Sequence, residues 1–505
     1  MLKQLFKTKS LDAILSEGAA SEHQLKRALG AFDVTMLGIG AIIGAGIFAT
    51  IGTAAAGDAL RPGAGPALIF SFVLTGIACG FAALCYAEFA AMVPISGSAY
   101  TYSYGTLGEL IAWIIGWDLI IEYAVGNVAV AISWANYFKT FAAGFGISIP
   151  DWLSTDYRTA ARIPGLFENA PHIFGVPIIF NFLSAGIVAL ITIVLVIGIR
   201  ESTRTNTVMV LIKLVILGIF VIIGWKYVKP GNWTPFAPNG WAGIQAGAAV
   251  VFFAYIGFDA VSTVAEEVRN PKRDLPIGII GSLIVCTVIY IGIAAVFTGI
   301  IPYRALVQML STQQAEPLTL ALQYAHIEKW GNLFVGIVAF GSVVAHTAVL
   351  LVFQLGQPRI FFSMARDGLL PKQFAEVHPR FKTPHVTTIL TGIAVGVTSM
   401  FTSIDEMVDL TNIGTLFAFV LVCVGVLILR RREPQRPRAF KTPFVPIIPI
   451  LGILSCLYLM HGLPGITWLR FAGWLIVGMV IYFMYGYRHS RLRSYLCESE
   501  KQWKS

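Results

Sequence analysis

The chain has 505 residues, of which 56% are hydrophobic and 12% are charged, and its mean hydropathy is +0.74. A folded soluble protein of this length needs more polar surface than such a composition provides, so a soluble globular protein is excluded. Uncharged runs of about 18 to 25 residues recur along the chain, and each is long enough to cross roughly 30 Å of hydrocarbon as a helix. The composition therefore predicts an all-α polytopic membrane protein.

Hydropathy predicts twelve transmembrane helices after a mixed-charge N-terminal segment, residues 1–30. That segment has no apolar core followed by a small-residue cleavage site, so we expect the first span to act as the insertion signal. The predicted spans are 33–57, 66–92, 107–138, 176–198, 206–227, 241–265, 275–301, 330–361, 385–403, 408–430, 444–462 and 467–487. The third and eighth are longer than a bilayer requires, which predicts that they tilt or extend into the interface.

Lysine and arginine are distributed unevenly between the two sides of these spans. With the N-terminus in the cytosol, 26 of the 36 basic residues fall on the cytosolic side, nine fall on the external side, and Lys213 lies within a span. Basic residues are enriched in cytosolic loops, so we expect both termini, including the tail 488–505, to be cytosolic. The formal charge of +9 then reflects topology and contact with lipid headgroups, and it does not indicate nucleic-acid binding.

The first and sixth spans are rich in residues that interrupt helices. Span one contains GIGAIIGAGIF at Gly38–Phe48, and span six contains FFAYIGFDAVS at Phe252–Ser262. One interpretation is close helix packing of the GxxxG kind, which Gly40 and Gly44 satisfy. The other is a pair of helices broken near the bilayer midplane, whose freed amides and carbonyls bind a ligand.

The places of these two spans in the chain favour the second interpretation. If spans one to five and six to ten are repeats of five helices, they must have opposite orientations, because five is an odd number. Broken helices at matching places in two inverted halves indicate the binding site of a secondary transporter. The expected repeats are residues 31–228 and 241–432, followed by two further helices in 433–487.

Five segments carry a resemblance to a known family. They are GAFDVTMLGIGAIIGAGIF at 30–48, CYAEFAAMVPISGSAYTYSY at 85–104, FFAYIGFDAVSTVAEEVRNPKRDLPIGII at 252–280, RDGLLP at 366–371 and LTNIGTLFAF at 410–419. Through them the sequence resembles the amino acid–polyamine–organocation (APC) superfamily, specifically a bacterial member of the cationic amino acid transporter (CAT) family. The resemblance implies a LeuT-type fold, with inverted five-helix repeats plus two C-terminal helices, in the bacterial plasma membrane. It also implies proton-linked transport of L-amino acids without a cofactor or a sodium site.

An L-amino acid presents one carboxylate and one ammonium group, and a broken helix complements both. Amides that begin the outer half of span one lie at a positive helix end and suit the carboxylate, whereas carbonyls freed at both breaks suit the ammonium. The expected substrate-binding residues are Ile39, Gly40, Ile43, Gly44, Ala45, Gly46 and Ile47 in span one, and Phe253, Ala254, Gly257 and Phe258 in span six. The family usually has a hydroxyl residue where this chain has Ala45, so a side-chain hydrogen bond made there in relatives is not expected here.

Aromatic residues of span six have two interpretations. Aromatic side chains at helical spacing are most often core residues. In a broken span we nevertheless expect at least one of them to close the pocket, and the resemblance favours Phe253 and then Phe258. Phe353 in span eight is expected to narrow the pocket further.

Two carboxylates lie within span three. Asp118 and Glu122 are four residues apart and share a helix face, and two acids inside a bilayer are not both readily ionised. Either both are structural acids, protonated or paired, or Glu122 is a proton site or a partner for a polar or cationic substrate side chain. Glu88 and Asp259 are interpreted as structural, with Asp259 stabilising the break in span six.

Within span five, the apolar run Thr207–Trp225 contains one charged residue, Lys213, about 9 Å from Thr207 at helical rise. A lone lysine at this depth can extend its ammonium back to the interface. The resemblance implies a different role, because in several relatives a lysine at the matching point takes the place of a sodium ion between spans one and eight. Burial disfavours the charged form of an amine, so such a lysine can load and release a proton and couple it to alternating access.

Span eight contributes His346, at a point where relatives typically have small or hydroxyl residues. A lone histidine within a membrane is most often a packing residue whose nitrogens are satisfied. Alternatively it tunes the proton affinity of Lys213 or carries a proton itself. His346 and Glu122 are therefore secondary candidates for proton coupling.

Other functions compete with proton symport. An obligate amino acid exchanger would use Lys213 as a fixed charge and move no net proton. A membrane enzyme would need clustered His, Asp or Glu near one interface, and the sequence shows neither such a cluster nor a CxxC pair for a metal. A receptor on the same fold would normally need an added soluble domain.

The substrate side chain is the least determined feature. An apolar pocket lining favours a broad preference for neutral L-amino acids, and Glu122 makes cationic amino acids the alternative. The expected partners are the substrate and the lipid bilayer, and the sequence does not indicate an oligomeric state.

Overall fold

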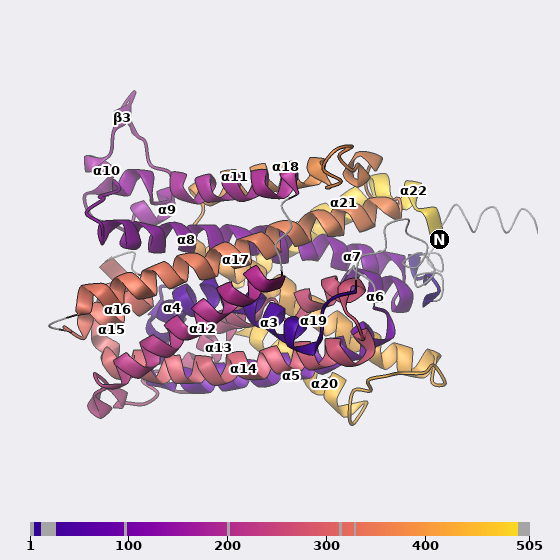
Figure 1. Cartoon of the computed structure of the whole chain (residues 1–505), viewed down its shortest axis with the longest axis horizontal. Coiled ribbons are helices and arrows are strands. Elements are labelled where there is room, and N and C mark those ends of the chain that lie inside the picture. The colour runs from indigo at the N-terminus through magenta and orange to yellow at the C-terminus, as the bar shows by residue number, and fades with distance from the viewer. Residues whose placement is uncertain are drawn as a thin grey trace, which may run out of the picture.

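The computed structural model of the chain describes residues 5–11, 27–94, 98–198, 203–312, 316–327 and 330–492. The other residues of the predicted N-terminal segment 1–30 and of the predicted tail 488–505 lie outside these ranges. Figure 1 shows long helices that run side by side along one axis of the molecule. Because helices satisfy their own backbone groups, a stack of apolar helices is a form that a bilayer permits. The chain is a mostly helical, polytopic membrane protein.

Helices make up nearly all of the regular structure, and the label η marks short 3₁₀ or π-helical segments. The segments up to Trp225 are α3 (Ala31–Ile42), η1 (Gly46–Thr50), α4 (Ile51–Ala56), η2 (Gly65–Ala67), α5 (Leu68–Met92), α6 (Ser98–Thr106), α7 (Glu109–Ile120), η3 (Ile121–Val125), α8 (Gly126–Ala143), η4 (Asp151–Leu153), α9 (Tyr157–Ala160), α10 (Leu166–Asn169), α11 (Phe182–Ile197) and α12 (Thr203–Trp225). The later ones are η5 (Pro230–Trp233), α13 (Gly240–Val251), η6 (Phe252–Tyr255), η7 (Asp259–Glu267), α14 (Pro271–Ile300), α15 (Tyr303–Thr312), α16 (Pro317–Tyr324), α17 (Gly331–Arg366), η8 (Lys372–Ala375), α18 (His385–Phe401), α19 (Ile404–Arg432), α20 (Ile447–His461), α21 (Gly465–Ile481), η9 (Tyr482–Gly486) and α22 (Tyr487–His489).

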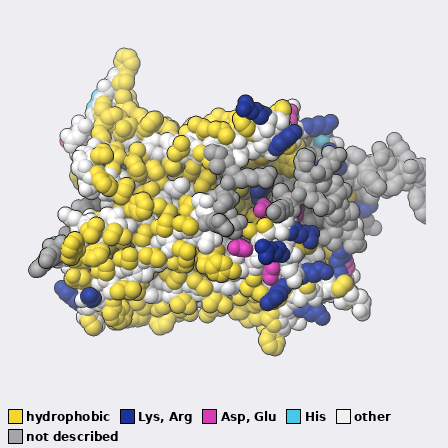
Figure 2. All heavy atoms as spheres, viewed as in Figure 1, with side chains coloured by type: hydrophobic (Ala, Val, Ile, Leu, Met, Phe, Trp, Pro, Cys, Tyr) yellow, Lys and Arg dark blue, Asp and Glu magenta, His cyan; other side chains and the backbone are white. Residues whose placement is uncertain are grey.

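Twelve apolar helical segments in the described ranges coincide with the predicted spans. Nine are long and apolar enough to cross a membrane, and α11, α18 and α20 are shorter apolar helices. Figure 2 shows hydrophobic side chains over the middle of the visible face, with lysine and arginine side chains gathered mostly toward the end where α22 lies. This agrees with the uneven distribution of basic residues along the sequence.

Two short antiparallel hairpins connect helices. β1 (Gly57–Asp58) pairs with β2 (Arg61–Pro62) between α4 and η2. β3 (His172–Ile173) pairs with β4 (Val176–Pro177) between α10 and α11.

The second hairpin corrects one predicted boundary. The fourth span was expected to start at residue 176, but that residue lies in β4 and α11 begins only at Phe182. Phe174 and Gly175 adopt positive φ angles of 50° and 79°, and these reverse the chain between the two strands. The apolar run of the sequence therefore forms two separate elements in the structure, the strand β4 and the helix α11.

Both ends of the described chain lie on the same side of the bundle. The Lys9 ammonium lies 3.0 Å from Asp367 Oδ1, and the Arg491 amide donates to the Asp367 carbonyl at 3.1 Å. The interrupted segments α3–η1 and η6–η7 contact each other inside the bundle and pack against α12, α14 and α17. The centre of the bundle is thus built around two broken helices.

Candidate substrate and coupling site

Both predicted helix breaks are present at the centre of the bundle. α3 ends at Ile42, and the next residue, Ile43, is extended with ψ 102°. In span six, η6 is followed by Ile256, which is extended with ψ 135°. Gly257 then has φ +117°, a conformation that residues with side chains rarely adopt. Each break leaves amides and carbonyls without partners in their own helix.

The glycines of span one also allow neighbouring helices to approach closely. A Cβ on Gly46 would lie 2.1 Å from Ala254 Cα, so the two broken spans touch at their backbones. The other three glycines face different helices: Gly38 faces Ser282 of α14, Gly40 faces Val210 of α12 and Gly44 faces Val349 of α17. Close packing and helix interruption therefore occur together in this motif.

Two polar residues outside the predicted site hold the breaks in place. The Tyr290 hydroxyl of α14 lies 2.9 Å from the Ala254 carbonyl and 3.2 Å from the Ile42 carbonyl, so it bridges both broken spans. Asn412 of α19 donates to the Ala249 carbonyl at 2.8 Å, near the end of α13. Asn412 lies in a segment that carried the resemblance, whereas no sequence signal distinguishes Tyr290 from a packing tyrosine.

Lys213 reaches into the break in span one. Its side chain is fully buried, and the ammonium donates to the Gly40 carbonyl at 2.7 Å and to the Ile43 carbonyl at 3.1 Å. The ammonium therefore caps the carbonyl end of α3, where a helix carries partial negative charge. A lysine extended back to the interface would be exposed, so the structure contradicts that alternative.

The same contact corrects part of the predicted substrate site. The carbonyls of Ile39 and Gly40 were expected to be free for a substrate ammonium. α3 continues to Ile42, so the Ile39 carbonyl accepts from the Ile43 amide at 2.9 Å, and the Gly40 carbonyl accepts from Lys213. In this conformation Lys213 occupies the position that the substrate ammonium was expected to take.

His346 has partners for both ring nitrogens. Nδ1 lies 2.6 Å from the Ser342 carbonyl, which can only accept, so Nδ1 carries the hydrogen. Nε2 then accepts from the Ser133 hydroxyl at 2.7 Å. The ring also contacts Phe48 and Tyr137, with centroid distances of 5.7 Å to each. The arrangement fits a neutral packing histidine, which is the first of its two predicted interpretations.

Three buried acids, Glu122, Asp259 and Asp118, lie close to one another. Glu122 lies in the π-helical turn η3, a geometry found frequently at functional sites, and its carboxyl group faces Asp259 and Thr415. Asp118 lies against α19, since a Cβ on Gly414 would be 2.8 Å from its Oδ1. Among the described residues, both Asp118 oxygens, both Asp259 oxygens and Glu122 Oε2 have no hydrogen-bond partner.

Asp259 was interpreted as a stabiliser of the break in span six. Its carboxyl group lies near the amides of Gly257 and Ala260, although neither contact has hydrogen-bond geometry. The group faces Glu122 from the other side. Asp259 therefore belongs to an acid pair as well as to the break.

The predicted binding residues share one property, burial inside the bundle. All thirteen are buried: Ile39, Gly40, Ile43, Gly44, Ala45, Gly46, Ile47, Glu122, Phe253, Ala254, Gly257, Phe258 and Phe353. Phe258 packs against Phe419 and Tyr86, with centroid distances of 5.0 and 5.9 Å. Phe353 lies 5.6 Å from Tyr123. Phe253 lies in the turn just before the break.

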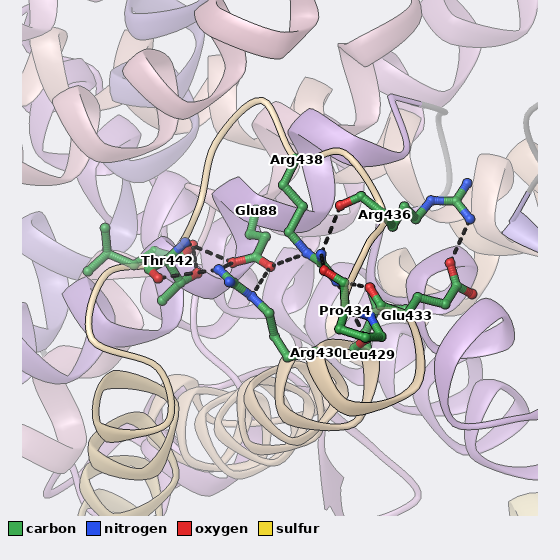
Figure 3. A network of polar contacts seen from close by, with 9 residues as sticks. Glu88, Leu429, Arg430, Glu433, Pro434, Arg436, Arg438 and Thr442 are labelled. Carbon is green, nitrogen blue, oxygen red and sulfur yellow. Dashed lines mark hydrogen bonds and ion pairs between the residues drawn. The ribbon is translucent and has the colours of Figure 1, made fainter.

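Glu88, at the end of α5, has a different environment (Figure 3). Arg430 of α19 donates to its two oxygens at 2.8 and 2.9 Å, and the Thr442 amide donates at 2.8 Å. Arg438 Nε lies 3.1 Å from Glu88 Oε1, and its guanidinium also donates to the Glu433 carbonyl at 2.8 Å. Glu88 therefore fastens the chain after α19 to α5, as its structural interpretation requires.

Backbone hydrogen bonds join the start of the first broken span to the end of the second. The amides of Ala28 and Leu29 donate to the Glu267 carbonyl at 2.9 and 3.0 Å, and the Arg269 amide donates to the Leu29 carbonyl at 2.9 Å. Leu29 directly precedes α3, and Glu267 ends η7. No residue pattern in the sequence predicts this short parallel bridge.

Charged groups also connect elements at the other end of the bundle. Arg61 of β2 lies 2.6 Å from Asp409 of α19 and 2.8 Å from Asp58 of β1. Burial lowers the pKa of the Arg61 guanidinium, but the charges of Asp409 and Asp58 raise its pKa above the ordinary value. Glu316, before α16, accepts from the Thr140 hydroxyl of α8 at 2.8 Å. Burial raises the pKa of this carboxyl to about 7.

Comparison with known proteins identifies the family. The sequence matches the family described as amino acid permease over residues 29–485. The chain belongs to the amino acid permease family. The permease is 45% identical over 491 residues to the methylthioribose transporter of Bacillus subtilis, and 46% identical over 492 residues to the branched-chain amino acid permease BcaP of that organism. Both alignments cover 97% of the permease and 100% of the relative.

A more distant relative connects the permease to the cationic amino acid transporters. The vacuolar cationic amino acid transporter 4 of Arabidopsis thaliana is 36% identical over 442 residues, which is 86% of the permease and 68% of that relative. The resemblance to the APC superfamily and to the CAT family is therefore confirmed. The permease is a multi-pass membrane transporter and not an enzyme.

Proposed function

We propose that the permease moves neutral L-amino acids across the bacterial plasma membrane by proton symport. The proposal includes a LeuT-type arrangement, in which residues 31–228 and 241–432 are inverted five-helix repeats, two further helices follow, and both termini are cytosolic. The observation that carries it is the buried contact of the Lys213 ammonium with the Gly40 and Ile43 carbonyls.

Loss of a proton from Lys213 would change the strength of this contact. Hydrogen bonds that involve a charged group contribute about 1.5–3 kcal/mol each, compared with about 1 kcal/mol for neutral ones. The ammonium also interacts favourably with the carbonyl end of α3, and a neutral amine does not. Deprotonation therefore loosens α3 from α12 and biases the first span toward a second arrangement, which is what coupling to alternating access requires.

The movement of α3 would reach the other broken span directly. Because the bridge between Leu29 and Glu267 ties the inner ends together, the inner halves of spans one and six move as one unit. Asp259, whose two oxygens have no partner among the described residues, and Glu122, which has one such oxygen, face the same region. Glu122 is a second protonatable group in this proposal and His346 is not required to titrate.

The coupling ion in this account is the proton, and neither a cofactor nor sodium is needed. A sodium ion at the break would need free carbonyl oxygens as ligands. The oxygens of Gly40 and Ile43 instead accept from the Lys213 ammonium, so the lysine supplies the positive charge there.

A neutral substrate is favoured over a cationic one. Amides at the start of the outer half of span one, around Gly44–Ile47, suit the substrate carboxylate, and Phe253 and Phe353 provide apolar lining. The 46% identical relative is named for branched-chain amino acids. Cationic amino acids are the alternative, through Glu122, and the name of the 45% identical relative adds methylthioribose to the candidates.

Transport by purified permease in liposomes tests the proposal. An inward proton gradient should drive accumulation of labelled leucine, isoleucine or valine above that of arginine, lysine and methylthioribose, equally well with and without sodium. Uptake that ignores the gradient but needs internal amino acid would show exchange instead. Preferential uptake of arginine or methylthioribose would overturn the substrate assignment and leave the coupling test intact.

A further inference from the structure

The hairpin formed by β3 and β4 ends in an exposed apolar tip. Figure 1 shows it projecting sideways from the bundle, away from the long helices and close to their ends opposite α22. Figure 2 shows hydrophobic side chains covering the tip. Phe174 is fully exposed at 104%, and Ile173 and Val176 are 57% and 62% exposed. No described part of the chain shields these three side chains.

The turn places a bulky residue where a small one fits better. Phe174 has φ +50° and Gly175 has φ +79°. Two-residue hairpin turns with positive φ at both positions favour Asn, Asp or Gly, and a bulky side chain in this conformation is an outlier. A phenylalanine that is both strained and exposed has no contact within the described chain that accounts for it. The geometry points to a contact outside the chain.

The base of the hairpin is held firmly, so the tip has a defined position. The Ile178 amide donates to the Pro171 carbonyl at 2.8 Å, and the Phe180 amide donates to the Trp152 carbonyl at 3.0 Å. A small separate core of Ala160, Leu166, Ala170 and Ile179 lies beneath it. The tip is therefore presented by a packed platform.

The length of α11 places the hairpin at the membrane surface. α11 has 16 residues and so spans about 24 Å, less than the roughly 30 Å of a hydrocarbon core. Its neighbour α18 has 17 residues and is almost as short. α11 alone therefore does not cross the full hydrocarbon core, and the hairpin, which is joined to it through residues 178–181, lies close to the interface on that side. Residues 169–199 contain no Asp, Glu, Lys or Arg, so nothing charged prevents this.

We propose that the tip, Ile173–Val176, inserts into the outer interfacial layer of the bilayer beside α11 and α18. A sideways projection enters that layer, whereas a projection along the helix axes would enter water. Exposed tryptophans, which are typical of the interfacial layer, lie at the ends of other spans that the proposed topology places outside, at Trp225, Trp241 and Trp330. The tip anchors the short α11–α18 side of the permease in the membrane and removes its apolar side chains from water.

Spin labels on single cysteines test this in full-length permease reconstituted in phosphatidylcholine liposomes. The five cysteines of the described residues are buried, and Cys497 is replaced by serine. Labels are placed at Phe174→Cys, at the exposed Glu168→Cys of α10 as the aqueous control, and at the exposed Leu190→Cys of α11 as the hydrocarbon control. Transport by each variant confirms that it folds. Collisions with oxygen and with a water-soluble nickel chelate report depth.

At position 174 we expect an oxygen-to-nickel collision ratio several-fold above that at 168 and up to that at 190. A ratio equal to that at 168 would place the tip in water and overturn the proposal. A label shielded from both reagents would also overturn it, because the tip would then be docked on a protein, either a second copy or a partner.

Discussion

Glu88 and the acids Glu122 and Asp259 are all buried in one bundle, but their surroundings are opposite. Glu88 accepts from Arg430 and from the Thr442 amide, with a second arginine beside it. Both oxygens of Asp259 and one of Glu122 have no partner among the described residues. A buried acid without partners is costly to keep, so it persists where a function uses it. The number of hydrogen-bond and ion-pair partners, more than burial, distinguishes acids that stabilise the fold from acids that can bind a proton or a substrate.

The largest effect should follow from removing Glu88, whose two carboxylate oxygens both have partners. Glu88→Ala leaves Arg430 and Arg438 without their anion, and breaking a buried pair in this way costs about 3–5 kcal/mol. We expect a large fall in the thermal midpoint, with little folded protein recovered. Glu433→Ala is the matched control, because its ion pair with Arg436 is partly exposed and contributes about 0–1 kcal/mol. Equal midpoints for the two variants would contradict the structural role of Glu88.

A conservative change at Glu122, which has one oxygen without a partner among the described residues, should have the opposite profile. Glu122→Gln keeps the shape of the side chain but cannot bind or release the proton. We expect proton-driven accumulation to fall at least about tenfold, equivalent to ~1.4 kcal/mol, while the thermal midpoint stays unchanged or rises. Glu88→Gln serves as the control and should lower the midpoint. If Glu122→Gln destabilises the permease as much as Glu88→Gln does, the distinction drawn from partner count fails.

His346 extends the comparison to a histidine whose nitrogens are both partnered. Ser133→Ala removes the hydroxyl that donates to Nε2 at 2.7 Å. The loss of one hydrogen bond should lower the stability by about 1 kcal/mol and leave the pH dependence of transport unchanged. A displaced pH profile of transport would instead assign His346 to proton coupling.

The last prediction concerns Glu316, a half-buried acid outside the membrane spans. Its pKa is about 7 in the folded chain and 4.5 ordinarily, so the folded state holds this proton more tightly than the unfolded state does. The stabilisation is complete at pH below 4.5 and is lost as the pH rises to about 7. Glu316→Gln should therefore flatten the fall of the thermal midpoint across this interval. An unchanged slope would show that another group titrates there.

The sequence predicts this fold well wherever one physical signal dominates. Long uncharged runs can only be stable as helices in a bilayer, so the spans were predictable. Dense glycine at Gly38–Gly46 and the Gly257 region marked both breaks, because glycine tolerates the open backbone and the close approach to Ala254. Lys213 stood out because a charge in an apolar run needs an explanation.

Features that depend on three-dimensional proximity could not be predicted from the sequence. Tyr290 bridges both breaks, yet it resembles any other tyrosine of an apolar helix. The bridge from Leu29 to Glu267 uses only backbone groups, which carry no residue signature. The hairpin before Phe182 was hidden because apolar strands and apolar helices read alike over short distances. The Ile39 carbonyl was expected to be free, but α3 extends to Ile42 and this carbonyl accepts from the Ile43 amide.

The central claim is that Lys213 couples a proton to the position of span one. The most direct measurement compares wild-type permease with Lys213→Ala in liposomes, following both substrate binding and accumulation driven by an inward proton gradient. The account predicts that Lys213→Ala binds substrate but does not accumulate it at mildly acidic or mildly alkaline pH. Normal gradient-driven accumulation by Lys213→Ala over that range would contradict the account.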